Sequence, residues 1–276
     1  MRTVSSDLYD KKYFLNVCAG SEEFKKSHGK KLFPRMEKLL KKIQINRTSK
    51  ILDVGCGRGD IALYMAKNAG EVIGIDYSKD GIDLANSIKK TFLQDIFKKV
   101  NFQVMNVKKL SFPDNYFDVV ICIDVLEHLY KEEAEIALSE IKRVLKKNGL
   151  LFLQTDVNRL LYDYTYKYYI FPMNRILTKA DQFVRGISYK PLPKDPRAPE
   201  EKTQHVNEPT YSYLKKLFAK FNFKGKIETE IGYIKPTKSI KAIIYNALIA
   251  FYPLSALYPL NIMFGWVFVC KLKNIK

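Results

Sequence analysis

The sequence predicts an α/β fold, in which a mostly parallel sheet is covered by helices on both faces. Three observations support this prediction. Apolar strand-like runs alternate with amphipathic helical segments between residues 50 and 155. One run, residues 116–124, is almost entirely apolar, as is typical of a central parallel strand covered on both sides. Another run, residues 51–54, ends in three alternating glycines and is followed by a helical pattern.

The composition limits the class of protein. The chain has 276 residues, which suits one such domain with additions. Its four cysteines form no C-x-x-C pair, and charges interrupt any apolar run at the N-terminus. We therefore expect a reduced, cytoplasmic protein. The net charge is +18, and residues 157–276 carry 20 Lys and Arg against 8 Asp and Glu. This excess suits a nucleic acid, an anionic membrane surface or an anionic substrate, or it is a lysine-rich surface without a specific partner.

The N-terminal segment contains one clear helical pattern, from Leu32 to Ile43, with an apolar side that packs and a lysine side that faces solvent. Tyr9 and Tyr13 precede it. They are best explained as packing residues, although they could also line a pocket.

The run from Ile51 to Asp60 organises the chain. Because glycine has no Cβ, residues 55, 57 and 59 allow a sharp turn and let a ligand approach the backbone. Backbone N–H groups at the start of the next helix then face that ligand. A dinucleotide-binding turn would place its last glycine one position later, where this chain has Asp60.

The segment Leu52-Asp53-Val54-Gly55-Cys56-Gly57-Arg58-Gly59 resembles motif I of the class I S-adenosylmethionine-dependent methyltransferases, in their small-molecule, type 11-like branch. The resemblance extends from about Tyr9 to Thr155. It implies a Rossmann-like, seven-stranded, mostly parallel sheet whose last strand is antiparallel, with lid insertions. It implies S-adenosylmethionine as cofactor and S-adenosylhomocysteine as product. It also implies that Asp53, Gly55, Cys56, Gly57 and Gly59 bind the cofactor and that the N-terminal segment caps the pocket.

The second predicted strand, residues 71–76, ends in an acid. A carboxylate at this end of a strand can accept two hydrogen bonds from a ribose diol. The resemblance assigns this role to Asp76, and it places Tyr77 beside the cofactor. Asp76 could instead cap the helix predicted over residues 79–91, but Ser78 suits that role better.

The third strand, residues 101–105, is followed by Asn106 and Val107. The family usually has Asp at this corner, where it accepts from the adenine amino group. The amide oxygen of Asn106 can accept the same bond without a charge. The strand over residues 116–124 brings Ile123 and Asp124 to the same edge, and we expect both of them, with Val107, to bind the cofactor. Residues 125–129 resemble the post-strand motif of small-molecule methyltransferases, and not the Asn/Asp-Pro-Pro-Tyr motif of amino-methylating nucleic-acid enzymes.

The remaining elements complete the pattern. We expect a helix over residues 132–147, closed by Asn148-Gly149, and a strand over 150–155. A helix over 210–221 and strands over 223–234 and 266–272 follow. The expected organisation is a single domain with four parts: an N-terminal cap (1–48), a cofactor-binding core (49–156), an aromatic substrate-lid insertion (157–207) and a C-terminal part that completes the sheet (208–276) and includes an apolar insertion (236–265).

Both insertions bear on the substrate. The first is rich in tyrosine and leaves the carboxyl end of the fifth strand, where open α/β sheets bind ligands, so we interpret it as a lid and not as a surface elaboration. The second contains no charged residue from Ala242 to Cys270, although prolines interrupt it. Since Lys235, Lys238 and Lys241 precede it, it suits a helix in a membrane interface. A buried lid is nearly as good an interpretation, and a transmembrane span is third.

In-line methyl transfer from a sulfonium needs a positioned acceptor and the exclusion of water. An oxygen acceptor also needs a base, for which we consider His205 and, second, His128. No cluster in the sequence has metal-ligand spacing, so no metal is expected.

The sequence therefore predicts a methyltransferase for a small-molecule or lipid-linked acceptor, such as a glycan, polyprenyl or quinone-like molecule. Two alternatives stay open: an RNA or protein methyltransferase, favoured by the charge, and a catalytically silent cofactor-binding partner subunit, favoured by the few available bases. A peripheral position at the inner membrane face is also considered. The sequence does not predict the oligomeric state.

Overall fold

Seven strands form one sheet in the computed structural model, which describes residues 2–186, 188, 190, 192–231 and 240–276. The strands are β1 (Lys50–Val54), β2 (Glu71–Asp76), β3 (Val100–Val104), β4 (Phe117–Ile123), β5 (Leu145–Thr155), β6 (Phe223–Ile231) and β7 (Gly265–Asn274). Their order in the sheet is β3-β2-β1-β4-β5-β7-β6. All pairs are parallel except those of β7, which is antiparallel to β5 and to β6. The predicted fold class is confirmed.

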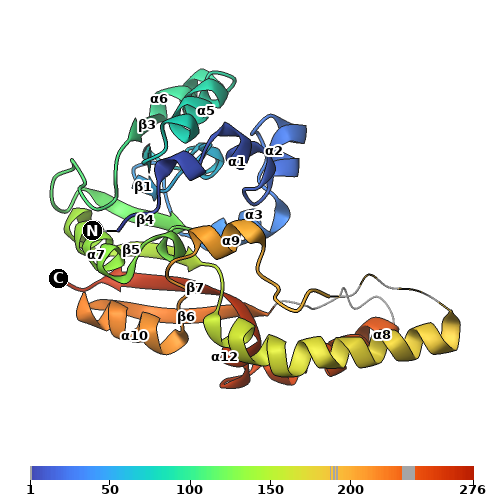
Figure 1. The fold of residues 1–276 in the computed structure, drawn as a ribbon. Coiled ribbons are helices and arrows are strands. Elements are labelled where there is room, and N and C mark those ends of the chain that lie inside the picture. The colour runs from blue at the N-terminus through green and yellow to red at the C-terminus, as the bar shows by residue number, and fades with distance from the viewer. Residues whose placement is uncertain (1, 187, 189, 191, 232–239) are drawn as a thin grey trace.

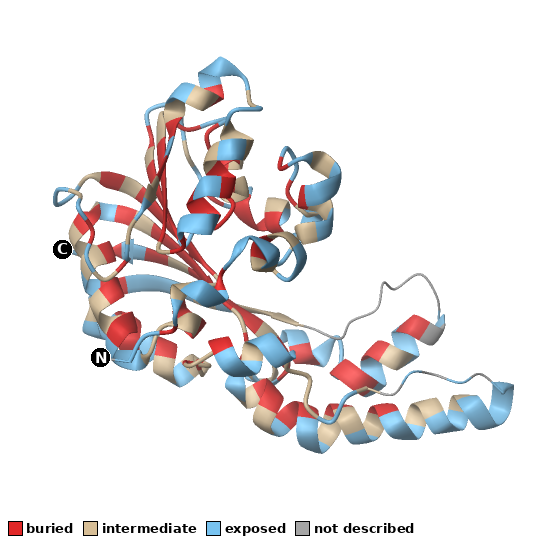
Figure 2. Cartoon of the chain, turned by 45° about the horizontal axis from the view of Figure 1, so that its top comes forward, coloured by how far each residue is buried: buried red, intermediate tan, exposed pale blue. Residues whose placement is uncertain are grey.

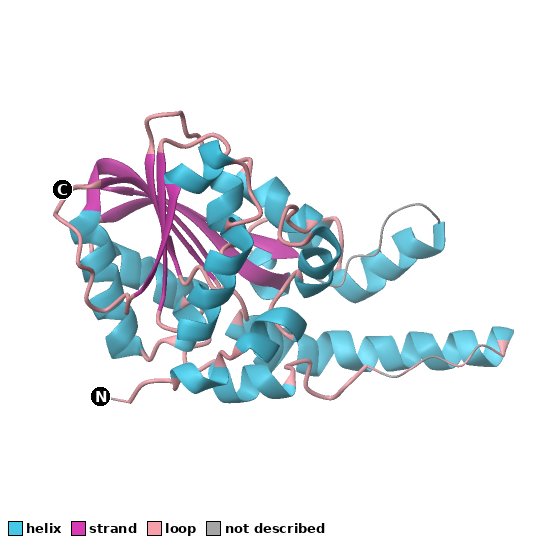
Figure 3. Ribbon diagram, turned by 90° about the horizontal axis from the view of Figure 1, so that it is seen from above, coloured by secondary structure: helices cyan, strands magenta, loops and turns pink. Residues whose placement is uncertain are grey.

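Helices cover both faces of this sheet (Figures 1 and 3). They are α1 (Lys11–Asn16), α2 (Ser21–Ser27), α3 (Pro34–Leu40), α4 (Asp60–Met65), α5 (Lys79–Lys89), α6 (Gln94–Lys99), α7 (Lys131–Val144), α8 (Phe171–Arg185), α9 (Pro199–Gln204), α10 (Tyr211–Lys220), α11 (Ile240–Ala250) and α12 (Leu260–Phe264). Short 3-10 helices lie at Ser6–Leu8 (η1), Leu126–His128 (η2) and Leu254–Ala256 (η4), and a π-helix spans Leu161–Ile170 (η3).

Alternate residues of the strands feed two apolar cores. Leu52 of β1 packs with the core that includes α7 and α10, whereas its neighbour Ile51 packs with the core that includes α3, α4 and α5. Both side chains are fully buried. This two-sided burial explains why the central strands are apolar at nearly every position. It also fixes the register that brings the carboxyl ends of β1, β2, β3 and β4 to one edge.

The boundary between α7 and β5 differs from the prediction. The helix ends at Val144, and the extended strand begins at Leu145, before the expected stop at Asn148-Gly149. Leu145 pairs with Phe117 of β4, and Nζ of Lys146 donates to Asp118 at 2.6 Å. Tertiary pairing with β4 thus overrides the local preference of this sequence for a helix end.

The two insertions form a helical arm. The aromatic stretch does not fold as a loop but as η3, which continues into α8, and α11 lies beside α8 (Figure 1). The arm projects away from the sheet, and the outer end of α8 is exposed (Figure 2). The predicted strand over 223–234 and the start of the apolar insertion extend beyond the described residues. In the described part of the chain, no helix has the length and apolar character needed to cross a bilayer.

Candidate active site

A glycine turn between β1 and α4 forms one wall of a cavity. Gly55, Gly57 and Gly59 all have positive φ angles, of 69°, 48° and 81°. A Cβ atom on Gly55 would lie 2.3 Å from Cγ2 of Val125, and one on Gly57 would lie 2.8 Å from the ring of Phe14. Glycine is therefore needed both for the backbone conformation and for the close packing, and the turn forms a cradle that a side chain would fill.

Asp76 ends β2 and holds this turn in place. Its carboxylate accepts hydrogen bonds from the backbone N–H of Gly57 at 2.9 Å and from that of Ser78 at 2.8 Å. Ser78, as expected, caps α5, because its Oγ accepts from the backbone N–H of Gly81 at 3.1 Å. Burial raises the pKa of Asp76, and the surrounding N–H groups oppose that shift. Asp76 is thus a buried acceptor on the cavity wall.

The cavity continues along the ends of β3 and β4. Asn106 lines it, and its Oδ1 accepts from the backbone N–H of Lys108 at 3.0 Å, a turn contact that leaves the second lone pair of this oxygen for a ligand. Asp124 lines it from the end of β4 with a φ of 53°. Its Oδ1 accepts from Nε2 of Gln154 at 2.9 Å.

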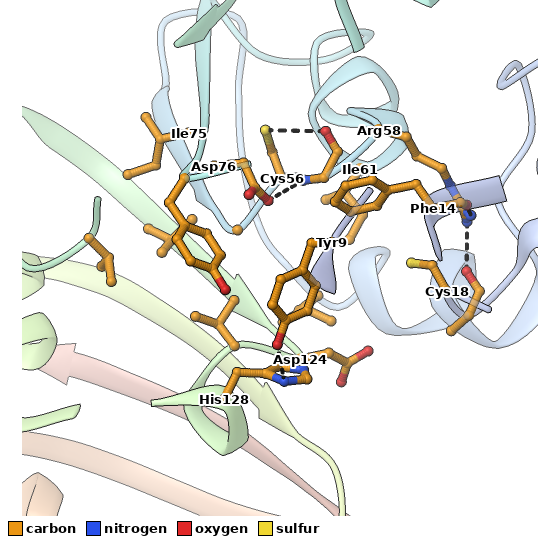
Figure 4. Close-up of a pocket in the computed structure, with 18 of the residues that line it drawn as sticks. Tyr9, Phe14, Cys18, Cys56, Arg58, Ile61, Ile75, Asp76, Asp124 and His128 are labelled. Carbon is orange, nitrogen blue, oxygen red and sulfur yellow. Dashed lines mark hydrogen bonds between the residues drawn. The ribbon is translucent and has the colours of Figure 1, made fainter. Parts of the chain in front are cut away.

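The N-terminal segment forms the roof. Tyr9, which follows η1, and Phe14 of α1 line the cavity (Figure 4). Tyr13 of α1 lines it too, so both tyrosines lie on the cavity wall. The guanidinium of Arg58, next to the glycine turn, anchors this segment. It donates to the backbone oxygens of Phe14 and Ala19, each at 2.6 Å, and Arg58 is 2% exposed. Arg58 therefore joins the glycine turn to the N-terminal segment that forms the roof.

The cavity is large enough for a small organic molecule. Its volume is about 190 Å³, against the roughly 10–15 Å³ that one water requires. Its walls are mainly apolar, with a few polar groups, as is typical of small-molecule sites. The N-terminal segment lines it, and no described residue of 157–207 or 236–265 does. The role of the aromatic insertion as a substrate lid stays a prediction.

The residues predicted to bind a cofactor converge on this cavity. Nine of the eleven line it: Gly55, Cys56, Gly57, Asp76, Tyr77, Asn106, Val107, Ile123 and Asp124. Asp53 and Gly59 do not. Asp53 is 2% exposed, and its Oδ2 is buried without a hydrogen-bond partner among the described residues. The position of a Cβ on Gly59 is occupied by Phe102. Both residues support the turn from behind.

The two predicted catalytic histidines lie together, but only one reaches the cavity. His128 lines it, and its Nδ1 lies 2.8 Å from the hydroxyl of Tyr9. The ring of His205 lies behind, 4.9 Å from that of His128, and its Nδ1 is buried without a hydrogen-bond partner. Burial lowers the pKa of His128 to about 3 and that of His205 to about 4, so both rings are neutral at neutral pH. His205, the preferred candidate base, thus does not line the cavity in this structure.

A cluster of buried carboxyl groups adjoins the histidines. Glu127 is fully buried, and its two oxygens accept from Oγ1 of Thr155 at 3.0 Å and from the backbone N–H of Asp156 at 3.1 Å. Burial raises the pKa of Glu127, and the neighbouring Asp124 raises it further. This cluster was not predicted as a unit, because Asp156 is 29 residues from Glu127 along the chain.

The fold also brings possible metal ligands together. Among the described residues, Glu127, His128 and His205 form one group whose ligand atoms lie within 4.8 Å of one another. Both oxygens of Glu127 already accept hydrogen bonds, and Nδ1 of His128 is hydrogen-bonded to the hydroxyl of Tyr9. The absence of a metal, predicted from sequence spacing, stays a prediction.

The acid cluster should make stability depend on pH through Asp124. Burial, and next the Asp156 carboxylate, raise the pKa of Asp124 to about 7, against about 3.9 for an unfolded chain. Between these values the folded state keeps a proton that the unfolded state has released. The free energy of unfolding therefore falls as pH rises from about 4 to about 7. Above about pH 7 the whole of this loss of stability is present.

We expect Asp124→Asn to reduce this loss, because asparagine can still accept from Gln154 and carries no charge. Thermal unfolding at about pH 5 and about pH 8 measures the effect. The exposed Asp83→Asn is the matched control. Parallel pH profiles for Asp124→Asn and the unsubstituted protein would contradict this assignment.

Comparison with known proteins finds methyltransferases. Residues 52–153 match a family model described as a methyltransferase domain. An uncharacterised methyltransferase of Schizosaccharomyces pombe is 38% identical over 110 residues, which cover 38% of this chain and 39% of that protein. A ubiquinone biosynthesis O-methyltransferase of Rickettsia typhi is 34% identical over 141 residues, 50% of this chain and 52% of that protein. The chain thus matches about half the length, or less, of these curated relatives.

Solved structures share the fold. A methyltransferase of Methanosarcina mazei, described as SAM-dependent, aligns with a TM-score of 0.53 at 21% identity, over 88% of this chain and 98% of that one. The [4+2]-cyclase SpnF aligns with a TM-score of 0.54 at 18% identity, over 87% of this chain and 80% of that one. At these identities the likeness concerns the fold alone.

The sequence motif, the fold, the family match and the relatives thus all indicate similarity to methyltransferases. Together they show that residues 52–153 match a methyltransferase domain.

Proposed function

We propose that the chain is an S-adenosylmethionine-dependent methyltransferase that acts on a small-molecule or lipid-linked acceptor by in-line transfer. The observation that carries this proposal is the cavity at the carboxyl edge of the sheet. There the glycine turn, Asp76 and Asn106 come together beneath an aromatic roof. Such an arrangement suits a ligand with a polar ribose, an adenine and a charged group.

The residues on the cavity wall fit this cofactor. The positive φ angles of Gly55 and Gly57 expose backbone where a Cβ would otherwise intrude. Asp76 offers buried carboxylate oxygens to hydroxyl donors, and Asn106 offers an amide oxygen to an amino group. When bound, S-adenosylmethionine would supply a methyl group on a positively charged sulfonium.

The chain's own residues would position the acceptor and exclude water. Tyr9, Tyr13 and Phe14 close the cavity from above, and removal of water strengthens every polar contact inside. The ring of His128 is neutral and hydrogen-bonds to Tyr9, so it orients that hydroxyl toward the cavity. We assign the proton of a hydroxyl acceptor to Asp124, since it is the lining carboxylate with a pKa near 7. His128 and His205 then act as positioning residues.

The relatives favour an oxygen acceptor on a quinone-like molecule, since several are named ubiquinone biosynthesis O-methyltransferases. This choice among acceptors is the finer part of the proposal. The identity of about a third over half the chain supports the reaction class better than it supports the substrate.

A transfer assay tests the proposal. The purified chain is incubated with methyl-labelled S-adenosylmethionine and cell extract, and the products are partitioned between organic and aqueous phases. We expect label in the organic phase, as for a lipid-linked or quinone-like acceptor. Asp124→Asn should lower the rate by roughly 100-fold if it is the base.

The other outcomes separate the alternatives. Label that enters RNA or protein in the aqueous phase would favour a macromolecular substrate. No label in any product, from a chain that still binds the cofactor, would favour a silent partner subunit. Either result would overturn the lipid-linked acceptor.

A further inference from the structure

The exposed side of α11 is apolar. Ile243, Ile244 and Leu248 are exposed, with Ile243 and Ile244 at 54% and 53%, whereas the polar Asn246 faces the interior and is 1% exposed. Ile249 is buried beside it. A helix that is apolar on all sides is normally covered by protein or lipid. In the described part of the chain nothing covers this side.

The loop that follows α11 also exposes apolar side chains. Leu254, Leu257 and Tyr258 are exposed at 51%, 62% and 75%. The backbone N–H groups of Ser255, Ala256 and Leu257 donate to carbonyls within the loop, each at 2.9 Å. The loop therefore keeps its shape with apolar side chains outward and these N–H groups satisfied, as entry into an apolar medium requires. We call these six exposed side chains the C-terminal apolar surface: Ile243, Ile244, Leu248, Leu254, Leu257 and Tyr258.

Cations lie on the helix that packs against α11. Lys167, Arg175 and Lys179 are exposed on η3 and α8, and within the described residues none of them forms a salt bridge. No acidic residue occurs between Ala242 and Cys270. The arm thus combines an apolar surface with cations that have no carboxylate partner, and it carries no negative charge on that surface.

We propose that the C-terminal apolar surface inserts into one face of an anionic lipid bilayer, without crossing it. Apolar side chains would enter the boundary between headgroups and acyl chains, and the neighbouring cations would contact anionic headgroups. The 11 residues of α11 make a helix of about 16 Å, which is about half of the thickness of a bilayer core. The helix therefore lies in the interface.

A bilayer fits this surface better than a protein partner does. Protein interfaces carry about one hydrogen bond per 100–200 Å². Five of the six side chains of the surface have no polar atom, and only Tyr258 offers a hydroxyl. The fluid hydrocarbon of a bilayer can cover such a surface without any hydrogen bonds. The cations without a carboxylate partner favour an anionic surface over a second copy of this chain, whose own net charge is +18.

The arm leaves the sheet at the edge that carries the cavity. Because β5 is parallel to β4 and β1, its end at Thr155 lies at the same edge as the glycine turn. The start of β7 at Gly265 pairs with the end of β6, so α11 and its loop also connect there. Docking would then bring the cavity edge to the lipid that holds the acceptor. This last step rests on the proposed function, whereas the lipid binding itself does not.

Flotation with vesicles tests the inference. The full chain is mixed with phosphatidylcholine vesicles that either contain or lack phosphatidylglycerol. We expect it to float with the anionic vesicles. Ile244→Asp and Leu257→Asp should each lower the bound-to-free ratio about tenfold or more. Leu93→Asp is the matched control, since Leu93 is 76% exposed and lies at the opposite end of the molecule, next to α6 (Figure 1).

Three results would overturn the inference. The first is no flotation of the unsubstituted chain with anionic vesicles. The second is equal flotation of all variants. The third is a dimer in solution that Ile244→Asp dissociates, without flotation, because the surface would then join two copies. Thermal unfolding and S-adenosylhomocysteine binding, measured on the same preparations, separate loss of lipid binding from loss of fold or of the cofactor site.

Discussion

Replacing Gly55 with alanine should lower the affinity for S-adenosylhomocysteine by about 100-fold or more. Two costs add at this position. The φ of 69° is unfavourable for alanine, by about 1–2 kcal/mol. The new Cβ would also lie 2.3 Å from Cγ2 of Val125, which itself lines the cavity. Either the turn or the cavity wall must move, and either movement takes away the space in which the glycine turn would hold a ligand. Calorimetric titration of the variant measures the loss.

Gly186→Ala is the matched control. Gly186 has a φ of 67° and no atom within 4 Å of its Cβ position. The same backbone penalty arises there, at the end of α8, without contact with the cavity. This variant should lose about 1 kcal/mol of stability and keep its affinity for the cofactor product. Equal affinities for Gly55→Ala and Gly186→Ala would contradict a cofactor role for the glycine turn.

Asp76→Asn should lower the same affinity by about 10- to 100-fold. Both carboxylate oxygens accept from backbone N–H groups, those of Gly57 and Ser78. Asparagine keeps one acceptor, but its NH₂ group faces the other N–H group. The variant loses the charge offered to the ligand and one hydrogen bond that fixes the turn. Asp83→Asn, on the exposed side of α5, is the control and should bind like the unsubstituted chain. Unchanged binding by Asp76→Asn would remove Asp76 from the site.

Much of the cavity wall could be predicted from the sequence. Asp76, Asn106 and Asp124 each lie at or within two residues of the end of a strand, and the carboxyl ends of neighbouring parallel strands share one edge. Their convergence therefore follows from local patterns and chain order alone. The family resemblance then suggested which of these residues face a ligand.

The family resemblance implies an N-terminal cap, but the contacts that hold this roof in place could not be predicted. Its contacts join distant segments, such as the bond from Arg58 to the carbonyl of Phe14, 44 residues away. Nothing in the local sequence indicates which carbonyl an arginine will meet. The hydrogen bond between Tyr9 and His128 spans 119 residues and has the same origin. The aromatic insertion was the more visible feature in the sequence, but its tyrosines build the helical arm.

That a residue belongs to the glycine motif also does not show whether it contacts a ligand or only supports the turn. Asp53 and Gly59 belong to the same motif as Gly55, yet Asp53 is buried away from the cavity, and Gly59 makes room for Phe102. Only the packing of the helices and strands around the turn decides whether each residue faces the cavity or the protein interior.

Titration of the unsubstituted chain with S-adenosylhomocysteine tests the central claim most directly. The account predicts saturable binding of one ligand per chain, with a Kd between about 1 μM and 1 mM, the usual range of enzyme affinities for small ligands. Absence of binding up to about 1 mM, from a chain whose circular dichroism shows the α/β fold, would contradict it.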